Sequence, residues 1–169
     1  MGRGATFRLT LPLPEDQRVT LDEPNRPSPT PTHLGAILTG VRVVVVEDEP
    51  DSRELVTTIL TRAGAIVHVA ASAAEGVNLL ENCEAQVLVS DLGMPDEDGY
   101  ALIQRVRRHE NPAIREIPAL ALTALASEED RSKAVRAGFT SHLGKPVAPR
   151  ELVDEVINLA LSGSGQHTH

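Results

Sequence analysis

The chain of 169 residues has very few aromatic side chains and a single cysteine. Aromatic residues make up only 2% of the sequence, so a hydrophobic core must be built from the aliphatic members of the 41% that are hydrophobic. Cys83 has no second cysteine in the chain with which to form a disulfide bond, and this favours a reducing compartment.

Positive charge and long apolar runs are also scarce. The 16 basic residues are outnumbered by 24 acidic ones, and the resulting net charge of -8 disfavours nonspecific binding to nucleic acid or to an anionic membrane. No apolar stretch approaches the roughly 20 residues that span a bilayer, and the start of the chain lacks the apolar core of a secretory signal. We therefore expect a cytoplasmic location without membrane contact.

The composition divides the chain into four segments. Residues 1–14 contain the alternating stretch Phe7–Leu11, which is typical of a half-buried strand but is too little to be stable alone. Residues 15–40 contain several prolines with polar neighbours, the composition of a semi-rigid linker. Residues 41–161 carry a regular apolar pattern, and residues 162–169, rich in Gly and Ser, are expected to be a disordered tail.

Short apolar runs alternate with helical patterns throughout residues 41–161. The first run, Val41–Val46, is largely β-branched, as expected for a strand buried on both faces. Pro50 and Pro149 suit the first turns of helices, and Gly64 and Gly138 suit helix ends. Further strands are expected near residues 65–70, 87–90, 117–122 and 139–143. This alternation predicts an α/β fold, with a doubly wound, five-stranded parallel sheet and five helices. The expected strand order is 2-1-3-4-5, which is a common order of such sheets.

Four polar side chains stand where four of these runs end: Asp48, Asp91, Thr123 and Lys145. Because the carboxyl ends of parallel strands meet at one edge of a sheet, we expect these side chains to converge there. Glu47 adds another carboxylate, and a hard cation such as Mg²⁺ would relieve the repulsion among the three. A competing interpretation is that the acidic run only favours the positive N-terminus of the following helix.

The same residues suit phosphoryl chemistry. Asp91 could attack phosphorus as a carboxylate nucleophile and form an acyl phosphate, although an Asp shortly before Met94–Pro95 could also be a simple turn residue. Lys145 would supply a point charge for the phosphoryl oxygens, and Thr123 a hydroxyl. Each residue is ordinary when taken singly, but four compatible groups in order after four strands are hard to assign to chance.

With these residues, the chain resembles a known family. Residues 41–161 are similar to the receiver domain of two-component response regulators, which has a flavodoxin-like fold. The matching stretches are Val43–Glu49, Ser90–Tyr100, Ala119–Ala124 and Ala137–Pro146.

The resemblance implies a role for each residue of this site. Asp91 would be the phosphoacceptor, and Thr123 and Lys145 would bind the phosphoryl group. Glu47 and Asp48 would hold Mg²⁺ together with Asp91 and the backbone carbonyl of Gly93. The Lys145–Pro146 bond is often cis in such domains.

One position departs from the family pattern. The residue three before the lysine is usually Tyr or Phe and acts as a rotating switch, whereas this chain has His142. His142 is either the switch residue or a partly exposed strand residue. Phe139 is nearby, but strand alternation predicts that it shares a face with Ser141 and not with His142.

The resemblance implies a phosphoacceptor in a phosphorelay and not an ordinary turnover enzyme. A histidine kinase or a histidine phosphotransfer protein would donate the phosphoryl group to Asp91. Transfer would then switch the surface formed by the helix near 127–137, the strand near 139–143 and the last helix, or the phosphoryl group would pass onward. That surface is the expected contact for a downstream signalling protein or for a homodimer.

The first residues carry a second resemblance. Residues 2–14 are similar to the last strand of a histidine-kinase ATP-binding domain, including its Ala5-Thr6-Phe7. The chain is therefore expected to be the C-terminal piece of a hybrid sensor kinase, and the rest of the ATP site is absent from it.

Two enzyme classes fit the sequence poorly. An Asp-nucleophile phosphatase needs a second Asp two residues after the nucleophile, where this chain has Gly93. A dinucleotide-binding enzyme needs glycines after the first strand, where this chain has Glu47–Pro50. The remaining alternative is an interaction module that is not phosphorylated, although all the expected site residues are present.

Overall fold

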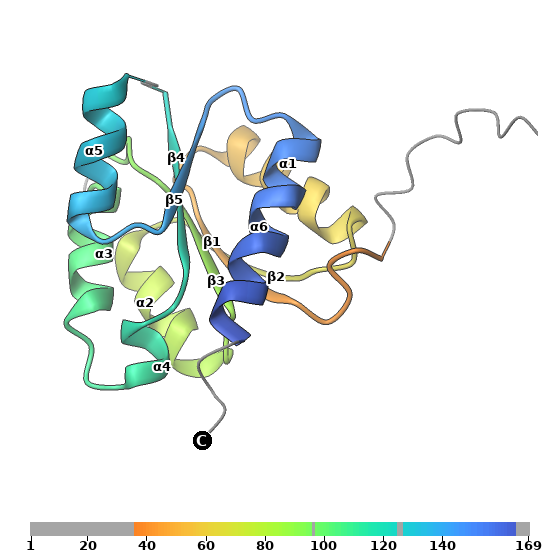
Figure 1. Cartoon of the computed structure of the whole chain (residues 1–169), viewed down its shortest axis with the longest axis horizontal. Helices are drawn as coiled ribbons and strands as arrows, with labels where there is room; N and C mark the ends of the chain where they lie inside the picture. Colours follow the sequence, from red (N-terminus) through yellow and green to blue (C-terminus); the bar gives the residue numbers. More distant parts are fainter. Residues whose placement is uncertain (1–35, 96, 125–126, 165–169) are drawn as a thin grey trace, which may run out of the picture. The chain divides into compact units, whose positions relative to one another are not determined.

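The computed structural model describes residues 36–164 except 96, 125 and 126 (Figure 1). The strand predicted within residues 1–14, most of the linker 15–40 and the last five residues of the predicted tail lie outside the described residues. Within residues 36–164, none of the helices combines the length and the apolar character that crossing a membrane requires.

The described residues form one sheet of five parallel strands in the order β2-β1-β3-β4-β5, as predicted. The strands are β1 (Arg42–Val46), β2 (Ile66–Ala70), β3 (Val87–Asp91), β4 (Ala119–Thr123) and β5 (Ser141–Gly144). The register pairs Val46 at the end of β1 with Ser90 of β3. The residues that follow β1 therefore lie beside the end of β3.

The helices of the described region number six, one more than predicted. They are α1 (Pro50–Arg62), α2 (Ala73–Asn82), α3 (Gly99–Arg107), α4 (Pro112–Arg115), α5 (Glu128–Ala137) and α6 (Pro149–Ser164). The prediction missed α4 because a single turn is too short to show an apolar period. Its only local signals are Pro112 in the first turn and the Asn111 side chain, which accepts a hydrogen bond from the Ala113 N–H.

The last helix is longer than predicted. It continues three residues past the expected end at residue 161 and includes Gly163 and Ser164. Ser162 and Ser164 donate their hydroxyls to backbone carbonyls one turn earlier, those of Asn158 and Ala160. The side chains that suggested a disordered tail are therefore bonded within the helix at these positions.

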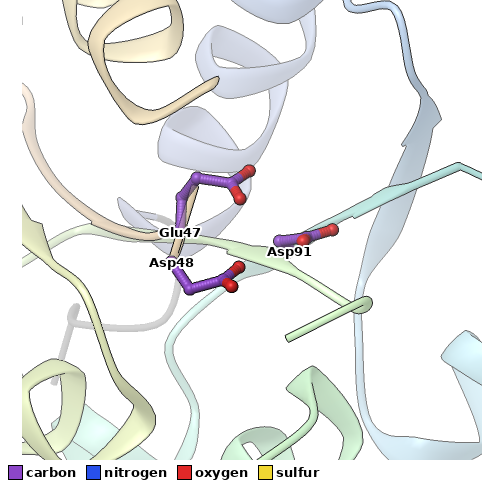
Figure 2. Close-up of side chains that lie close together, drawn as sticks. All are labelled: Glu47, Asp48 and Asp91. Atoms are coloured by element: carbon purple, nitrogen blue, oxygen red, sulfur yellow. The ribbon is translucent and has the colours of Figure 1, made fainter. Parts of the chain in front are cut away.

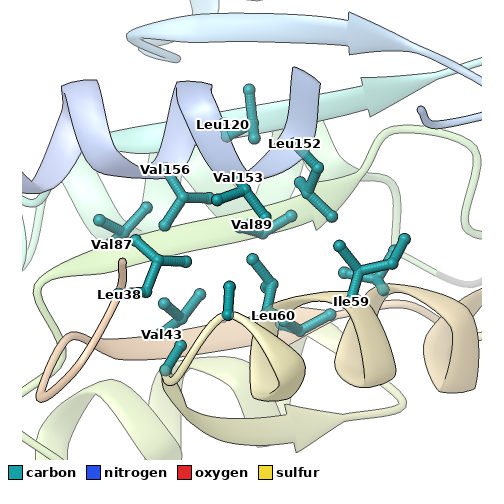
Figure 3. Close-up of a cluster of buried hydrophobic side chains, with 14 of the residues drawn as sticks. Leu38, Val43, Ile59, Leu60, Val87, Val89, Leu120, Leu152, Val153 and Val156 are labelled. Atoms are coloured by element: carbon teal, nitrogen blue, oxygen red, sulfur yellow. The ribbon is translucent and has the colours of Figure 1, made fainter. Parts of the chain in front are cut away.

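The core consists of two aliphatic layers, one on each face of the sheet. Alternate valines of β1 face opposite layers: Val43 and Val45 pack with α1 and α6 (Figure 3), and Val44 and Val46 pack with α2, α3 and α5. Among the described residues, Phe139 is the one aromatic side chain in the buried core. The prediction of an aliphatic core is confirmed.

Residues 36–40 are part of the domain and not of the linker to which they were assigned. Leu38 is fully buried in the layer with α1 and α6, and its backbone N–H donates to Ala63 O at 2.7 Å. The turn passes through Gly40, which has a φ of 81°, a conformation that glycine adopts without strain. The apolar run Ala36–Leu38 at the end of a polar, proline-rich stretch is too short to show a period from which a core contact could be predicted.

Arg107 of α3 ties together three segments around β4. Its Nε donates to Gly138 O at 2.9 Å, and its Nη1 donates to Arg115 O at 2.7 Å and Ile117 O at 2.8 Å. Burial lowers the pKa of Arg107, but a guanidinium stays protonated in proteins. One side chain thus satisfies three backbone carbonyls.

We expect Arg107→Met to lower the free energy of unfolding by about 1–3 kcal/mol, because the carbonyls lose a charged donor that water replaces only in part. Urea denaturation measures the change. Arg108→Met is the matched control, since Arg108 is the next residue and is exposed. Equal unfolding free energies for the two variants would contradict the role of Arg107.

Candidate functional site

The predicted site residues meet at the carboxyl edge of the sheet. Asp48 follows β1, Asp91 and Thr123 are the last residues of β3 and β4, and Lys145 directly follows β5. The Lys145 N–H donates to Thr123 O at 2.7 Å, which fixes the two segments side by side. The Lys145–Pro146 bond is cis, as the resemblance implied.

Three carboxylates lie close together at this edge (Figure 2). One carboxylate oxygen each from Glu47, Asp48 and Asp91 lies within 4.8 Å of the other two. Glu47 is only 1% exposed and Asp91 only 6%, so water screens their charges poorly. Such an arrangement is unfavourable unless positive charge lies nearby.

Lys145 supplies that positive charge. Its Nζ lies 2.7 Å from Glu47 Oε2 and 3.2 Å from Asp91 Oδ1. Burial opposes the charged form of Lys145, but the hydrogen bonds and the charges of Glu47 and Asp91 outweigh burial and raise the pKa of Lys145. The ammonium therefore stays protonated at neutral pH.

Glu47 is the most buried of the three carboxylates. Burial raises the pKa of Glu47, the hydrogen bond from Lys145 acts in the opposite direction, and the charge of Asp91 raises it further. The ammonium 2.7 Å from Glu47 Oε2 favours the ionised form of Glu47. Additional positive charge beside it would stabilise the site.

The donor set fits a divalent cation. Carboxylate oxygens are the ligands that a hard cation such as Mg²⁺ prefers, and the ion usually keeps several waters while a few carboxylates bind it. Gly93, the predicted carbonyl ligand, lies beside the same group, because a Cβ at this position would come 3.5 Å from Asp91 Oδ2. The chain could therefore hold such an ion between the ends of β1 and β3.

His142 lies on the face of the sheet that α5 covers. It pairs with Ala121, which packs in the layer of α2, α3 and α5, and its Nε2 accepts a hydrogen bond from Arg131 Nε of α5 at 3.0 Å. The prediction for Phe139 was wrong, because Phe139 is buried in this same layer. Phe139 precedes β5 and closes the turn after α5, where its N–H donates to Ala134 O, so strand alternation does not apply to it.

Two residues of this region were not predicted from the sequence. Arg53 of α1 donates from Nη1 to Glu47 O at 2.9 Å and to Asp48 O at 3.2 Å. Gly99, the first residue of α3, lies so close to Asp91 O that a Cβ there would overlap it. Arg53 lies outside the stretches that carry the resemblance, and Gly99 lies in Ser90–Tyr100 without a role assigned to it. Both contacts are made to backbone atoms, whose positions the sequence does not show.

Comparison with known proteins identifies the family. Residues 43–157 match the response regulator receiver domain, and the chain therefore belongs to this family. Receiver domains are signalling phosphoacceptors of two-component systems and not classical enzymes. They interact with histidine kinases or histidine phosphotransfer proteins.

Individual relatives differ in length. The chain is 50% identical over 111 residues to an uncharacterized 14.6 kDa protein of Leptolyngbya boryana, and the match covers 66% of this chain and 83% of that protein. It is 30% identical over 142 residues to hybrid signal transduction histidine kinase D of Dictyostelium discoideum, and the match covers 80% of this chain but 9% of the kinase.

A solved receiver domain is similar in structure. It belongs to a sensor histidine kinase of Pseudomonas aeruginosa, is 29% identical, and superposes with a TM-score of 0.65 over 72% of this chain and 98% of that one. That structure has a magnesium ion coordinated in its active site cleft. The present chain, which carries the acidic pocket of Glu47, Asp48 and Asp91, has the same fold as that domain.

We expect Gly99→Ala to lower the free energy of unfolding by about 1–3 kcal/mol, because a methyl group against Asp91 O forces α3 and β3 apart. Urea denaturation again measures the change. Gly93→Ala is the control, since its Cβ would meet neighbouring atoms only at ordinary contact distances. The steric role of Gly99 would be refuted by equal losses in both variants.

Proposed function

We propose that this chain is the phosphoacceptor of a phosphorelay and that Asp91 receives the phosphoryl group from a phosphohistidine. The observation that carries the proposal is the position of Asp91. Its carboxylate is almost buried at the carboxyl edge of the sheet, with an ammonium 3.2 Å from Oδ1 and two further carboxylates beside it. That combination provides a nucleophile, an ammonium that neutralises phosphoryl charge, and carboxylates that would hold a cation for the same purpose.

The residues divide the chemistry among them. A carboxylate oxygen of Asp91 attacks phosphorus, an acyl phosphate forms, and the bond from phosphorus to the donor imidazole breaks with its electron pair going to nitrogen. Lys145 and the Thr123 hydroxyl bind oxygens of the arriving group. Glu47, Asp48, Asp91 and the Gly93 carbonyl would hold Mg²⁺, and the bound ion supplies further neutralisation of phosphoryl charge.

An apolar groove beside the site supports docking of the donor against α1. It has a volume of about 350 Å³ and is lined by Ser52, Leu55 and Val56 of α1 and by Lys145, Pro146 and Val147. The Leu55 side chain is 50% exposed. A helical donor that covers this groove would bury Leu55 and bring its phosphohistidine to the same edge as Asp91.

The output surface in this proposal comprises α5, β5 and α6. After phosphorylation, Thr123 moves toward the phosphoryl group, and the equilibrium between two arrangements of this surface shifts. In this proposal His142 is the switch residue, because it accepts a hydrogen bond from Arg131 that joins β5 to α5 at this surface. A downstream protein, or a second copy of the chain, binds the shifted surface.

Two settings are compatible with this chemistry. In the first, the domain is the receiver of a hybrid kinase in the cytoplasm, which the similarity to kinase D supports. In the second, it acts as a small separate receiver, which is favoured by the match to 83% of the Leptolyngbya protein.

The proposal is tested by intact mass after incubation with acetyl phosphate and Mg²⁺. We expect one phosphoryl adduct on the parent and on Asp51→Asn, an exposed acidic control in the first turn of α1. Asp91→Asn should give none, and chelation of the metal should abolish the adduct on the parent. A folded parent without adduct would favour the unphosphorylated interaction module, and an adduct on Asp91→Asn would mean that another residue is the acceptor.

The switch role of His142 has its own test. In His142→Phe the acceptor of the Arg131 hydrogen bond is lost, so we expect α5 amides of the unphosphorylated variant to exchange hydrogen about as fast as those of the phosphorylated parent. Hydrogen exchange with and without acetyl phosphate measures this. Arg136→Met, an exposed position of the same helix, should behave as the parent does. If the α5 amides of unphosphorylated His142→Phe exchange at the rate of the unphosphorylated parent, the switch role is ruled out.

A further inference from the structure

Arg53 contacts the backbone from which two of the three carboxylates project. Its Nη1 donates to Glu47 O at 2.9 Å and to Asp48 O at 3.2 Å, and both contacts are partly buried. Among the described residues, the hydrogen bonds of the Arg53 guanidinium go to these backbone carbonyls and not to a carboxylate. It therefore acts on the main chain of the acidic segment and not on its charges directly.

The segment that Arg53 contacts belongs to no helix or strand. Residues 47–49 connect the end of β1 to the start of α1 and belong to neither element. Pro50, which begins α1, has no N–H with which to bond back to this connection. The orientation of the two peptide planes after Glu47 and Asp48 decides where their side chains point.

Arg53 itself is held firmly. Its N–H donates to Glu49 O at 2.9 Å, and its own carbonyl accepts from Thr57 Oγ1 at 2.6 Å. The helix that carries it is packed into the core by Val56, Ile59 and Leu60. Because this helix is fixed in the core, the Arg53 side chain can hold the connection that it contacts in one position.

We propose that Arg53 is a positioning residue for the cation site. By binding two successive carbonyls it keeps the Glu47 and Asp48 carboxylates directed at the place where Asp91 lies, so that a divalent cation meets ligands already in position. The proposal rests on the proposed function, because it assigns Mg²⁺ to these three carboxylates.

The charge of Arg53 and its contacts with the backbone have opposite effects on the affinity of the site for Mg²⁺. A guanidinium near a cation site repels the cation, so its charge alone would weaken metal binding. Its hold on the ligand segment strengthens binding, because an ordered site does not have to be ordered by the metal. Groups that orient ligands typically change metal affinity 10- to 100-fold when removed, and we expect this effect to exceed the repulsion.

Titration of the metal-free protein with Mg²⁺ alone, followed by calorimetry or by amide chemical shifts, tests the proposal. We expect the Mg²⁺ dissociation constant of Arg53→Met to rise about tenfold, at the lower end of that range. Arg53→Lys keeps the charge on a more flexible stem without the rigid planar guanidinium, and it should fall between the parent and Arg53→Met. Arg62→Met, exposed in the last turn of the same helix, should bind as the parent does.

A second measurement separates positioning from loss of folded protein. The rate of phosphorylation by acetyl phosphate is measured as a function of Mg²⁺ concentration. Positioning predicts that Arg53→Met needs about tenfold more Mg²⁺ but approaches the parental rate at saturation. A smaller folded fraction would instead lower the phosphorylated amplitude at every Mg²⁺ concentration.

The outcomes are distinguishable. Parental or tighter Mg²⁺ binding by Arg53→Met overturns the positioning role and leaves the proposed function intact, and tighter binding would mean that the charge of Arg53 dominates. A reduced amplitude with an unchanged Mg²⁺ requirement also overturns it. A folded parent that neither binds Mg²⁺ nor becomes phosphorylated overturns the proposed function and this inference together.

Discussion

The repulsion among three carboxylates at one edge of the sheet is the constraint around which this domain is built. Glu47 and Asp91 are almost completely buried, so their mutual repulsion is screened less than on a surface. The fold tolerates this because Lys145, which follows β5 three places along the sheet from β1, reaches both groups. A site held in this state has a strong tendency to bind positive charge, which is what phosphoryl chemistry requires.

The two aliphatic layers make that arrangement possible. Every residue of β3 and β4 is buried, so these central strands cannot slip by one position without turning apolar side chains out of their layers. The register then fixes the ends of β1, β3 and β4 at the same edge. Two small contacts refine the position of the acidic groups there: the close approach of Gly99 to Asp91 O and the two bonds of Arg53.

The sequence predicted the parts of the structure that rest on periodic patterns. Strands β1 to β5 and the convergence of Asp48, Asp91 and Lys145 follow from apolar runs and from what comes directly after them. The strand order follows from the fold type that this alternation indicates and not from the runs themselves. Leu38, α4 and the end of α6 were missed because each depends on a contact or a turn too short to leave a period. Arg53 and Gly99 were missed for a different reason. Their partners are backbone carbonyls, whose positions only the folded chain defines.

The burial of Leu38 also decides where the preceding chain is attached. Residues 36–40 lie at the amino edge of the sheet, next to Ala63 and the start of β1, whereas Asp91 lies at the carboxyl edge. A strand of five residues separates the two edges by roughly 16 Å. A donor module joined before residue 36, together with its tether, would have to cover that distance to reach Asp91. The length and stiffness of that tether would set the effective concentration of donor at Asp91.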